Sequence, residues 1–307
     1  MTRKTIVAML MALALVVAAC SSDDADTDTT TTVAGEDNAT TTTAGTDSGD
    51  TTTTTVDPEL PIDAPERTLV VAATGTPSGF DGDIFGPNMQ NAVVNLNEPL
   101  VDYELAGTEV NGDEVRPRLA ESWTVSDDGL TYTIKLREGV LSHLGNELTA
   151  EDVVWSYEKS IAQGRTGNFI RNVGNVDSIE ATGTYEVQFT LTAPSPIFIR
   201  AITVYTPSIY DSTELKTHAT DDDPYATEWL KSNFAGYGPY YVDQFTPGQQ
   251  VIFKANPNYW DGVPYYTTIV YQAVPEPANR VALLTAEEVD YIEAPSQQQL
   301  VELSNNS

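Results

Sequence analysis

Cysteine and histidine are scarce in this 307-residue chain, which contains one cysteine and two histidines. Cys20 has no second cysteine to pair with, so the sequence excludes an internal disulfide framework and a cysteine-based metal site. His143 and His218 lie outside any G-x-S-x-G or H-E-x-x-H context, and no spacing assigns two acidic residues to opposite sides of a cleft. We therefore expect no enzyme activity, no cofactor and no metal, with a cell-wall hydrolase as the disfavoured alternative.

Basic residues are also few, with 15 Lys and Arg against 45 Asp and Glu and a formal net charge of −30. A chain without a basic stripe is not expected to bind nucleic acid. Solubility in a salty or anionic environment accounts for such an excess of acid. A preference for cationic ligands is the alternative interpretation.

The N-terminus has the pattern of a secretion signal. Arg3 and Lys4 precede an apolar run, Ile6 to Ala19, that is too short to span a membrane comfortably. The run ends in Val17-Ala18-Ala19-Cys20, which resembles a lipobox. We predict that residues 1–19 are a lipoprotein signal peptide and that Cys20 is acylated with chains such as palmitate, two of which suffice for stable anchoring in the bilayer. An ordinary secretory signal is the alternative.

Residues 20–65 are rich in threonine and aspartate and have almost no aliphatic side chains. Such a segment cannot bury enough surface to fold. We predict a disordered tether with a root-mean-square reach of roughly 35–40 Å. A long tether is typical of the outer face of a Gram-positive cell membrane, where the chain is expected to be lipid-anchored, and its threonines are candidates for O-glycosylation.

The clearest local pattern lies between residues 119 and 161. Apolar residues alternate with polar ones from Leu130 to Arg137, which predicts a half-buried strand. The turn signal Asp127-Asp128-Gly129 predicts a hairpin with residues 123–125. Thr149 is a candidate helix cap, followed by acids in the first turn and an apolar stripe that recurs every four residues.

Further patterns predict a mixed α/β fold. The run Asp221-Asp222-Asp223 lacks the glycine and the distal glutamate of a calcium loop, so we predict that Asp223 caps a helix that starts at Pro224 and ends near Phe234. Other helices are predicted at 89–96 and 275–284. Strands are predicted at 68–74, 185–191, 203–210, 240–245, 251–255 and 269–274.

Several of these segments resemble one family, the solute-binding proteins of family 5, which are extracytoplasmic receptors of peptide-type ABC importers. The similar motifs include LAESW from Leu119, SDDGLTYT from Ser126, LTAEDVV from Leu148, NEPLVDY from Asn97, GYGPY from Gly236 and NPNYW from Asn256. The resemblance extends from Thr68 to Ile292. Three positions depart from the family pattern: Gly82 replaces a proline, Leu144 an aspartate and Glu287 a glycine that ends a helix with positive φ.

The resemblance implies an α/β fold with mixed sheets, the first lobe of a periplasmic-binding-protein type II-like domain. Residues 66–307 would form the solute-binding domain, with a lobe I core at 66–100 and 205–307 and an inserted hairpin and helix subdomain at 101–204. Family members are longer and close two lobes around the solute. The second lobe is therefore expected to be largely missing, and a truncated fragment that binds no solute is one alternative.

The resemblance also implies a function: capture of a peptide or a related small solute and its delivery to ABC permease subunits. A cell-surface sensory or interaction lipoprotein with the same fold is another alternative. The family also handles nickel chelates, sugars and opines, so the solute stays open. The candidate ligand-binding residues lie in the loop after the first strand, in the chain crossing and in the GYGPY motif, although packing inside the lobe is an equal alternative for each: Phe80, Asp81, Phe85, Asn88, Tyr205 and Tyr237.

Overall fold

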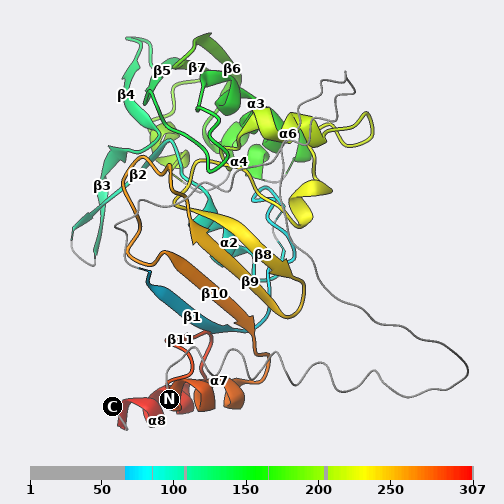
Figure 1. Ribbon diagram of the computed structural model, residues 1–307. Helices are drawn as coiled ribbons and strands as arrows, with labels where there is room; N and C mark the ends of the chain where they lie inside the picture. Colours follow the sequence, from blue (N-terminus) through cyan, green and yellow to red (C-terminus); the bar gives the residue numbers. More distant parts are fainter. Residues whose placement is uncertain (1–65, 85, 107–108, 165, 204–206, 306–307) are drawn as a thin grey trace, which may run out of the picture. The chain divides into compact units, whose positions relative to one another are not determined.

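The computed structural model describes residues 66–84, 86–106, 109–164, 166–203 and 207–305, and only the backbone of residues 104–106 and 109–114. The predicted signal peptide, Cys20 and the predicted tether lie outside these residues, as do the predicted ligand contacts Phe85 and Tyr205. Within the described part, no helix combines the length and the apolar character needed to cross a membrane. The described strands form three sheets, which helices accompany (Figure 1).

The largest sheet has five strands and joins the two ends of the described chain (Figure 1). Its strands, in spatial order, are β11 (Tyr291–Ile292), β1 (Thr68–Ala73), β10 (Thr268–Ala273), β9 (Gln250–Ala255) and β8 (Tyr240–Thr246). β1 runs parallel to β10 and to β11, whereas β9 is antiparallel to both of its neighbours. The carboxyl ends of the three parallel strands therefore meet at one edge of the sheet.

The two faces of β1 pack against different helices. Val71 and Ala73 belong to a hydrophobic cluster that includes residues of helix α2 (Met89–Leu96). Ala72 belongs to another cluster, against which apolar residues of helix α7 (Pro277–Thr285) pack. Because side chains alternate along a strand, this period of two covers both faces of the parallel part of the sheet.

The GYGPY motif passes close to the end of α2. A Cβ atom added at Gly238 would lie 2.2 Å from the carbonyl oxygen of Leu96, which no side chain permits. Asn256, the first residue of the NPNYW motif, donates from Nδ2 to the carbonyl of Gly238 at 3.2 Å. These two motifs are therefore linked to each other by contacts inside the fold.

A second sheet has four antiparallel strands, in the order β4 (Ala120–Val125), β5 (Thr131–Leu136), β7 (Glu186–Leu191) and β6 (Val176–Gly183). The predicted hairpin and the strand near residues 185–191 are thereby confirmed. Helix α3 (Ala150–Gln163) begins after Thr149, as predicted, and the Asp152 carboxylate accepts hydrogen bonds from the Thr149 amide at 2.8 Å and hydroxyl at 2.9 Å. Side chains of this sheet and of α3 share one hydrophobic cluster.

The remaining described elements are short. They comprise one two-stranded sheet and several helical segments. Their bounds are β2 Val101–Ala106, β3 Glu109–Pro117, α4 Thr166–Val173, α5 Phe198–Ala201, α6 Ser212–His218, the 3₁₀ turn η2 Trp229–Lys231, and α8 Gln297–Asn305.

The predicted helix after Asp223 is wrong. Asp223 caps no helix: its carboxylate accepts hydrogen bonds from the amides of Thr227 at 2.9 Å and Glu228 at 2.8 Å within a turn, and the residue that precedes η2 as its N-cap is Glu228. Ala226 has a φ of 51°, and a left-handed residue cannot continue a right-handed helix. Only the 3₁₀ turn η2 follows.

The predicted strand at residues 203–210 is also wrong where the structure describes it. Thr203 closes a turn after α5, with its amide 3.3 Å from the carbonyl of Arg200. Tyr210 forms a single bridge to Gly236 rather than a strand. Residues 204–206 lie outside the described part of the chain.

Glu287 confirms the expectation that the residue at this position, where the family pattern has a glycine, has a positive φ. Its φ is 57°, in the left-handed region, just after helix α7 ends. The backbone therefore keeps the conformation that glycine adopts without strain, and a glutamate adopts it here instead.

Candidate functional site

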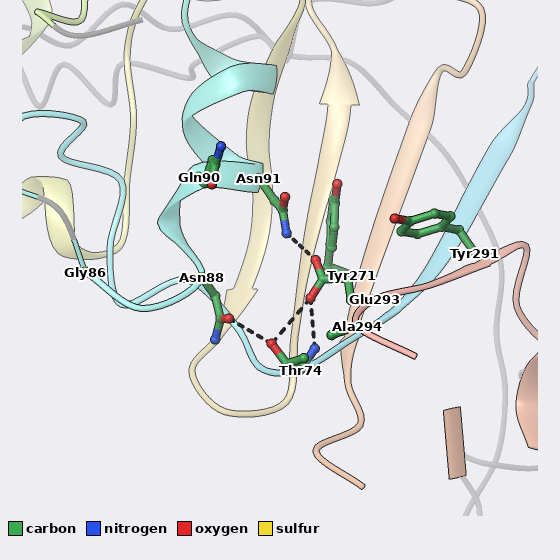
Figure 2. Close-up of a pocket in the computed structure, with 9 residues that line it drawn as sticks. All are labelled: Thr74, Gly86, Asn88, Gln90, Asn91, Tyr271, Tyr291, Glu293 and Ala294. Atoms are coloured by element: carbon green, nitrogen blue, oxygen red, sulfur yellow. Dashed lines mark hydrogen bonds between the residues drawn. The ribbon is translucent and has the colours of Figure 1, made fainter. Parts of the chain in front are cut away.

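A cavity of about 490 Å³ lies at the carboxyl ends of β1 and β11 and beside the N-terminus of α2 (Figure 2). Open α/β sheets place ligand sites outside the carboxyl ends of their parallel strands. The lining residues come from β10, from β11 and the residues after it, from the loop after β1 and from the first turn of α2: Thr74, Gly86, Asn88, Gln90, Asn91, Tyr271, Tyr291, Glu293 and Ala294. The location and the lining make this cavity the candidate site.

Glu293 is the centre of the hydrogen bonds in the cavity (Figure 2). Its Oε2 accepts from the Thr74 amide at 2.9 Å and lies 3.4 Å from the Thr74 hydroxyl, and its Oε1 accepts from Asn91 Nδ2. The Thr74 hydroxyl also donates to Asn88 Oδ1 at 2.9 Å. We call these four residues the Glu293 cluster; they connect β1, the exit of β11 and the start of α2.

Backbone constraints hold the cluster in place. Arg280 of α7 is buried and donates from Nε to the carbonyl of Glu293 at 2.9 Å and from Nη2 to that of Ala294 at 3.3 Å. Asn88 has a φ of 59°, a left-handed conformation that asparagine tolerates better than most residues. Both sides of the Glu293 cluster are therefore fixed before any ligand enters.

Two tyrosines supply the aromatic surface of the cavity. Tyr271 lies on β10, and burial raises the pKa of its hydroxyl, with Glu293 adding to the shift and a hydrogen bond with Asn95 opposing it. Tyr291 of β11 is 57% exposed. An exposed ring at a cavity is available to stack on a ligand.

A second cluster of charges fixes the loop between β1 and α2. Lys159 of α3 is fully buried, and its Nζ lies 2.6 Å from Asp81 Oδ1 and 2.9 Å from Asp83 Oδ2. Asp81 also accepts from Gln163 Nε2 at 3.0 Å and from the Tyr210 hydroxyl at 3.2 Å. Burial raises the pKa of Asp83, while the charge of Lys159 opposes that shift. We call Lys159, Asp81 and Asp83 the Lys159 cluster.

Of the four predicted ligand contacts that the structure describes, Asn88 alone lines the cavity. Phe80 is fully buried against Phe245 and Phe253, with ring centroids 4.9 and 6.3 Å away. Asp81 is buried in the Lys159 cluster. Tyr237 is buried in the cluster formed by the four-stranded sheet and α3, where burial raises the pKa of its hydroxyl.

Sequence reasoning missed Thr74, Asn91, Tyr291 and Glu293. The signal for two of them was available in part, since Thr74 is the last residue of the strand predicted at 68–74 and Glu293 directly follows the short strand β11. The sequence does not reveal that β1 and β11 are adjacent and parallel, with Val71 opposite Tyr291. That pairing is what brings Glu293 to Thr74.

The lining of the cavity is suited to hydrogen bonding with a ligand. Amides, a carboxylate and phenol rings line the cavity, and the two histidines are engaged elsewhere: His143 stacks on Tyr241, and His218 stacks on Trp229 and contacts Glu214. The described residues contain no group of three or more side chains suited to hold a metal ion.

The mixed α/β architecture is similar to that of solved periplasmic binding proteins. Residues 114–307 match the family model of the bacterial extracellular solute-binding proteins, family 5 Middle. The match covers more than half of the chain, and the chain belongs to this family.

Named relatives extend this result. The dipeptide-binding protein of Escherichia coli (strain K12) is 29% identical over 249 residues, which are 75% of this chain and 45% of the relative. The oligopeptide-binding protein AppA of Bacillus subtilis (strain 168) is 30% identical over 224 residues, covering 70% and 40%. The solved structure of AppA with a nonapeptide is similar at a TM-score of 0.61 and 25% identity, covering 77% of this chain and 46% of that one. The chain spans less than half the length of these relatives.

Proposed function

We propose that this chain is the extracytoplasmic solute-binding component of an ABC importer, which binds a peptide or a related small solute in the Glu293 cavity and presents it to a membrane permease. The observation that carries the proposal is the position of the cavity. In a family 5 chain, it lies where the parallel strands β1 and β11 end, with amides and two tyrosines around it.

The character of the cavity supports a solute of peptide size. Its volume of about 490 Å³ lies within the range of small-molecule sites, which run from roughly 300 to 1,000 Å³. The side-chain amides of Asn88, Gln90 and Asn91 offer both donors and acceptors, which a peptide backbone requires. Two relatives carry dipeptide- and oligopeptide-binding names, which favours peptides over other solutes.

We also propose that Cys20 anchors the chain to the outer face of the cell membrane. The lipobox-like residues before Cys20 support this, as does the Thr-rich segment after it. Mass spectrometry of the N-terminal peptide should show a diacylglyceryl cysteine at position 20. The Cys20→Ser variant should be released from the membrane fraction, and its retention there would contradict the anchor.

Calorimetric titration of the purified chain with peptides of two to nine residues tests the binding site. In the Tyr291→Ala variant, the loss of one aromatic contact is expected to weaken binding by about two- to tenfold. Tyr265→Ala is the matched control, because Tyr265 is also exposed, at 68%, but does not line the cavity. Equal affinities in both variants would place the site elsewhere, and no binding of any peptide would refute peptides as the solute.

A further inference from the structure

The charges of the cavity lining are strongly unbalanced. Of its nine lining residues, Glu293 is the only one with a charged side chain at neutral pH, and none is Lys, Arg or His. Among the described residues, no salt bridge involves the Glu293 carboxylate. A carboxylate that lines a cavity without a cationic partner can interact favourably with a positive group that enters the cavity.

Arg280 does not neutralise this carboxylate. Its guanidinium donates to four backbone carbonyls, those of Val274, Pro275, Glu293 and Ala294. The interactions of Arg280 are therefore with the main chain of the segment that carries Glu293. The Glu293 side chain therefore has no basic partner in the lining of the cavity.

The carboxylate also has unused capacity for hydrogen bonds. A carboxylate has about four acceptor positions. The Thr74 amide and Asn91 Nδ2 occupy two of them, and the Thr74 hydroxyl, at 3.4 Å, is shared with Asn88. An ammonium or guanidinium group could thus donate to Glu293 without displacing the contacts that hold the cluster together.

Two features next to Glu293 also favour a cationic group over an anionic one. Tyr271 and Tyr291 line the cavity beside Glu293, and phenol rings attract cations through their faces. The donors that would otherwise bind an anion, the Thr74 amide and the Asn91 amide at the start of α2, already bind Glu293. The Glu293 carboxylate would therefore repel an anionic group of a solute, and these two donors would not be available to bind it.

We propose that Glu293 makes the cavity selective for solutes that carry a cationic group, either the α-ammonium of a peptide or a basic side chain. This inference rests on the proposed function, since it assigns the chemical class of the solute to the same cavity. It also accounts for the acidic residue at this position beyond its role in joining β1, α2 and the exit of β11.

Calorimetry with four tripeptides, each amidated at its C-terminus, tests the inference and distinguishes the two sources of positive charge. Ala-Ala-Ala carries only an α-ammonium, acetyl-Ala-Lys-Ala carries only a side-chain ammonium, and acetyl-Ala-Ala-Ala and acetyl-Ala-Glu-Ala carry neither. At least one of the two cationic peptides is expected to bind about tenfold more tightly than acetyl-Ala-Ala-Ala, the size of one charge-assisted hydrogen bond. The acidic peptide is expected to bind most weakly.

Glu293→Gln should abolish this preference, because glutamine keeps an oxygen for the Thr74 amide but loses the charge. Glu180→Gln is the matched control: it removes one charge from an exposed position on β6, outside the cavity, and should keep the preference. The preference of the unaltered chain should also shrink as salt is raised, a measurement that does not depend on the variant folding.

The outcomes separate the two proposals. Equal binding of cationic and neutral peptides, or a preference that persists in Glu293→Gln, would overturn the charge selectivity and leave the binding function standing. Absence of binding for every peptide would overturn the proposed binding of peptides in this cavity, and with it the selectivity.

Discussion

The Lys159 cluster and the Glu293 cluster use similar chemistry with opposite exposure. Both hold the loop between β1 and α2, the first through Asp81 and Asp83 and the second through Thr74. In the Lys159 cluster the ammonium and both carboxylates are almost completely buried and their opposite charges face each other. In the Glu293 cluster a single carboxylate lines a cavity without a basic partner. The carboxylates of the Lys159 cluster thus stabilise the fold, whereas the carboxylate of the Glu293 cluster is proposed to recognise the solute.

The largest effect is expected from breaking the Lys159 cluster. Lys159→Met leaves Asp81 and Asp83 buried without a cation, which should lower the free energy of unfolding by about 3–5 kcal/mol. Urea denaturation measures this loss. Lys135→Met is the control, because Lys135 is half exposed and pairs with Glu121 at the surface, so its loss should change stability by less than about 1 kcal/mol. Equal losses in the two variants would show that burial does not distinguish the pairs.

A smaller effect, visible mainly as a change in pH dependence, is expected from Asp83→Asn. Burial raises the pKa of Asp83 above its ordinary value of 3.8, so the folded chain holds this proton more tightly than the unfolded chain. The free energy of unfolding must then fall as the pH rises through the raised pKa. Asparagine does not titrate, so the variant should lose this part of the decline and change stability at neutral pH by less than about 2 kcal/mol.

Urea denaturation from about pH 4 to about pH 8 checks the slope. The control is Asp222→Asn, which changes an exposed carboxylate outside the Lys159 cluster. A slope in Asp83→Asn that equals that of the unaltered chain would show that Asp83 does not titrate in this range.

The smallest effect is expected at Glu287, which lies between α7 and β11. Its φ of 57° strains a residue with a side chain, so Glu287→Gly should raise the free energy of unfolding by about 1 kcal/mol. Affinity for peptides should not change, because Glu287 does not line the cavity. Thermal unfolding and calorimetry together test this, and a loss of affinity would mean that the approach to β11 adjusts when the solute binds.

Local patterns predicted much of the secondary structure and little of the site. The period of two from Leu130 to Arg137 and the acids after Thr149 depend on neighbours a few residues away, and β5 and α3 confirm both. The helix expected after Asp223 was wrong, because Ala226 turns left-handed although its residue type gives no sign of it. Among the predicted contacts that lie in the described part of the chain, Asn88 alone was found at the cavity.

The remaining site residues depend on contacts that no local pattern encodes. The Thr74 amide and the Glu293 carboxylate are 219 positions apart in the sequence. Nothing in the sequence distinguishes Lys159 from an exposed lysine on a helix. In the structure it is fully buried between two aspartates that lie 78 and 76 positions away in the sequence. Whether such a side chain is buried, and which group it pairs with, depends on how strands and helices that are far apart in the sequence pack against each other.

By itself the sequence determined the family and where most strands and the main helices lie. Motifs, turn signals and the alternation of apolar with polar residues all depend on residues that are close together in the chain. The tertiary structure decided that Asp81 and Asp83 are buried against Lys159, where they hold the loop after β1, and that Glu293 lines a cavity. A carboxylate's role depends on its burial and on the charge beside it, and here both are set by the pairing of β1 with β11 and by the packing of α3 on the loop after β1.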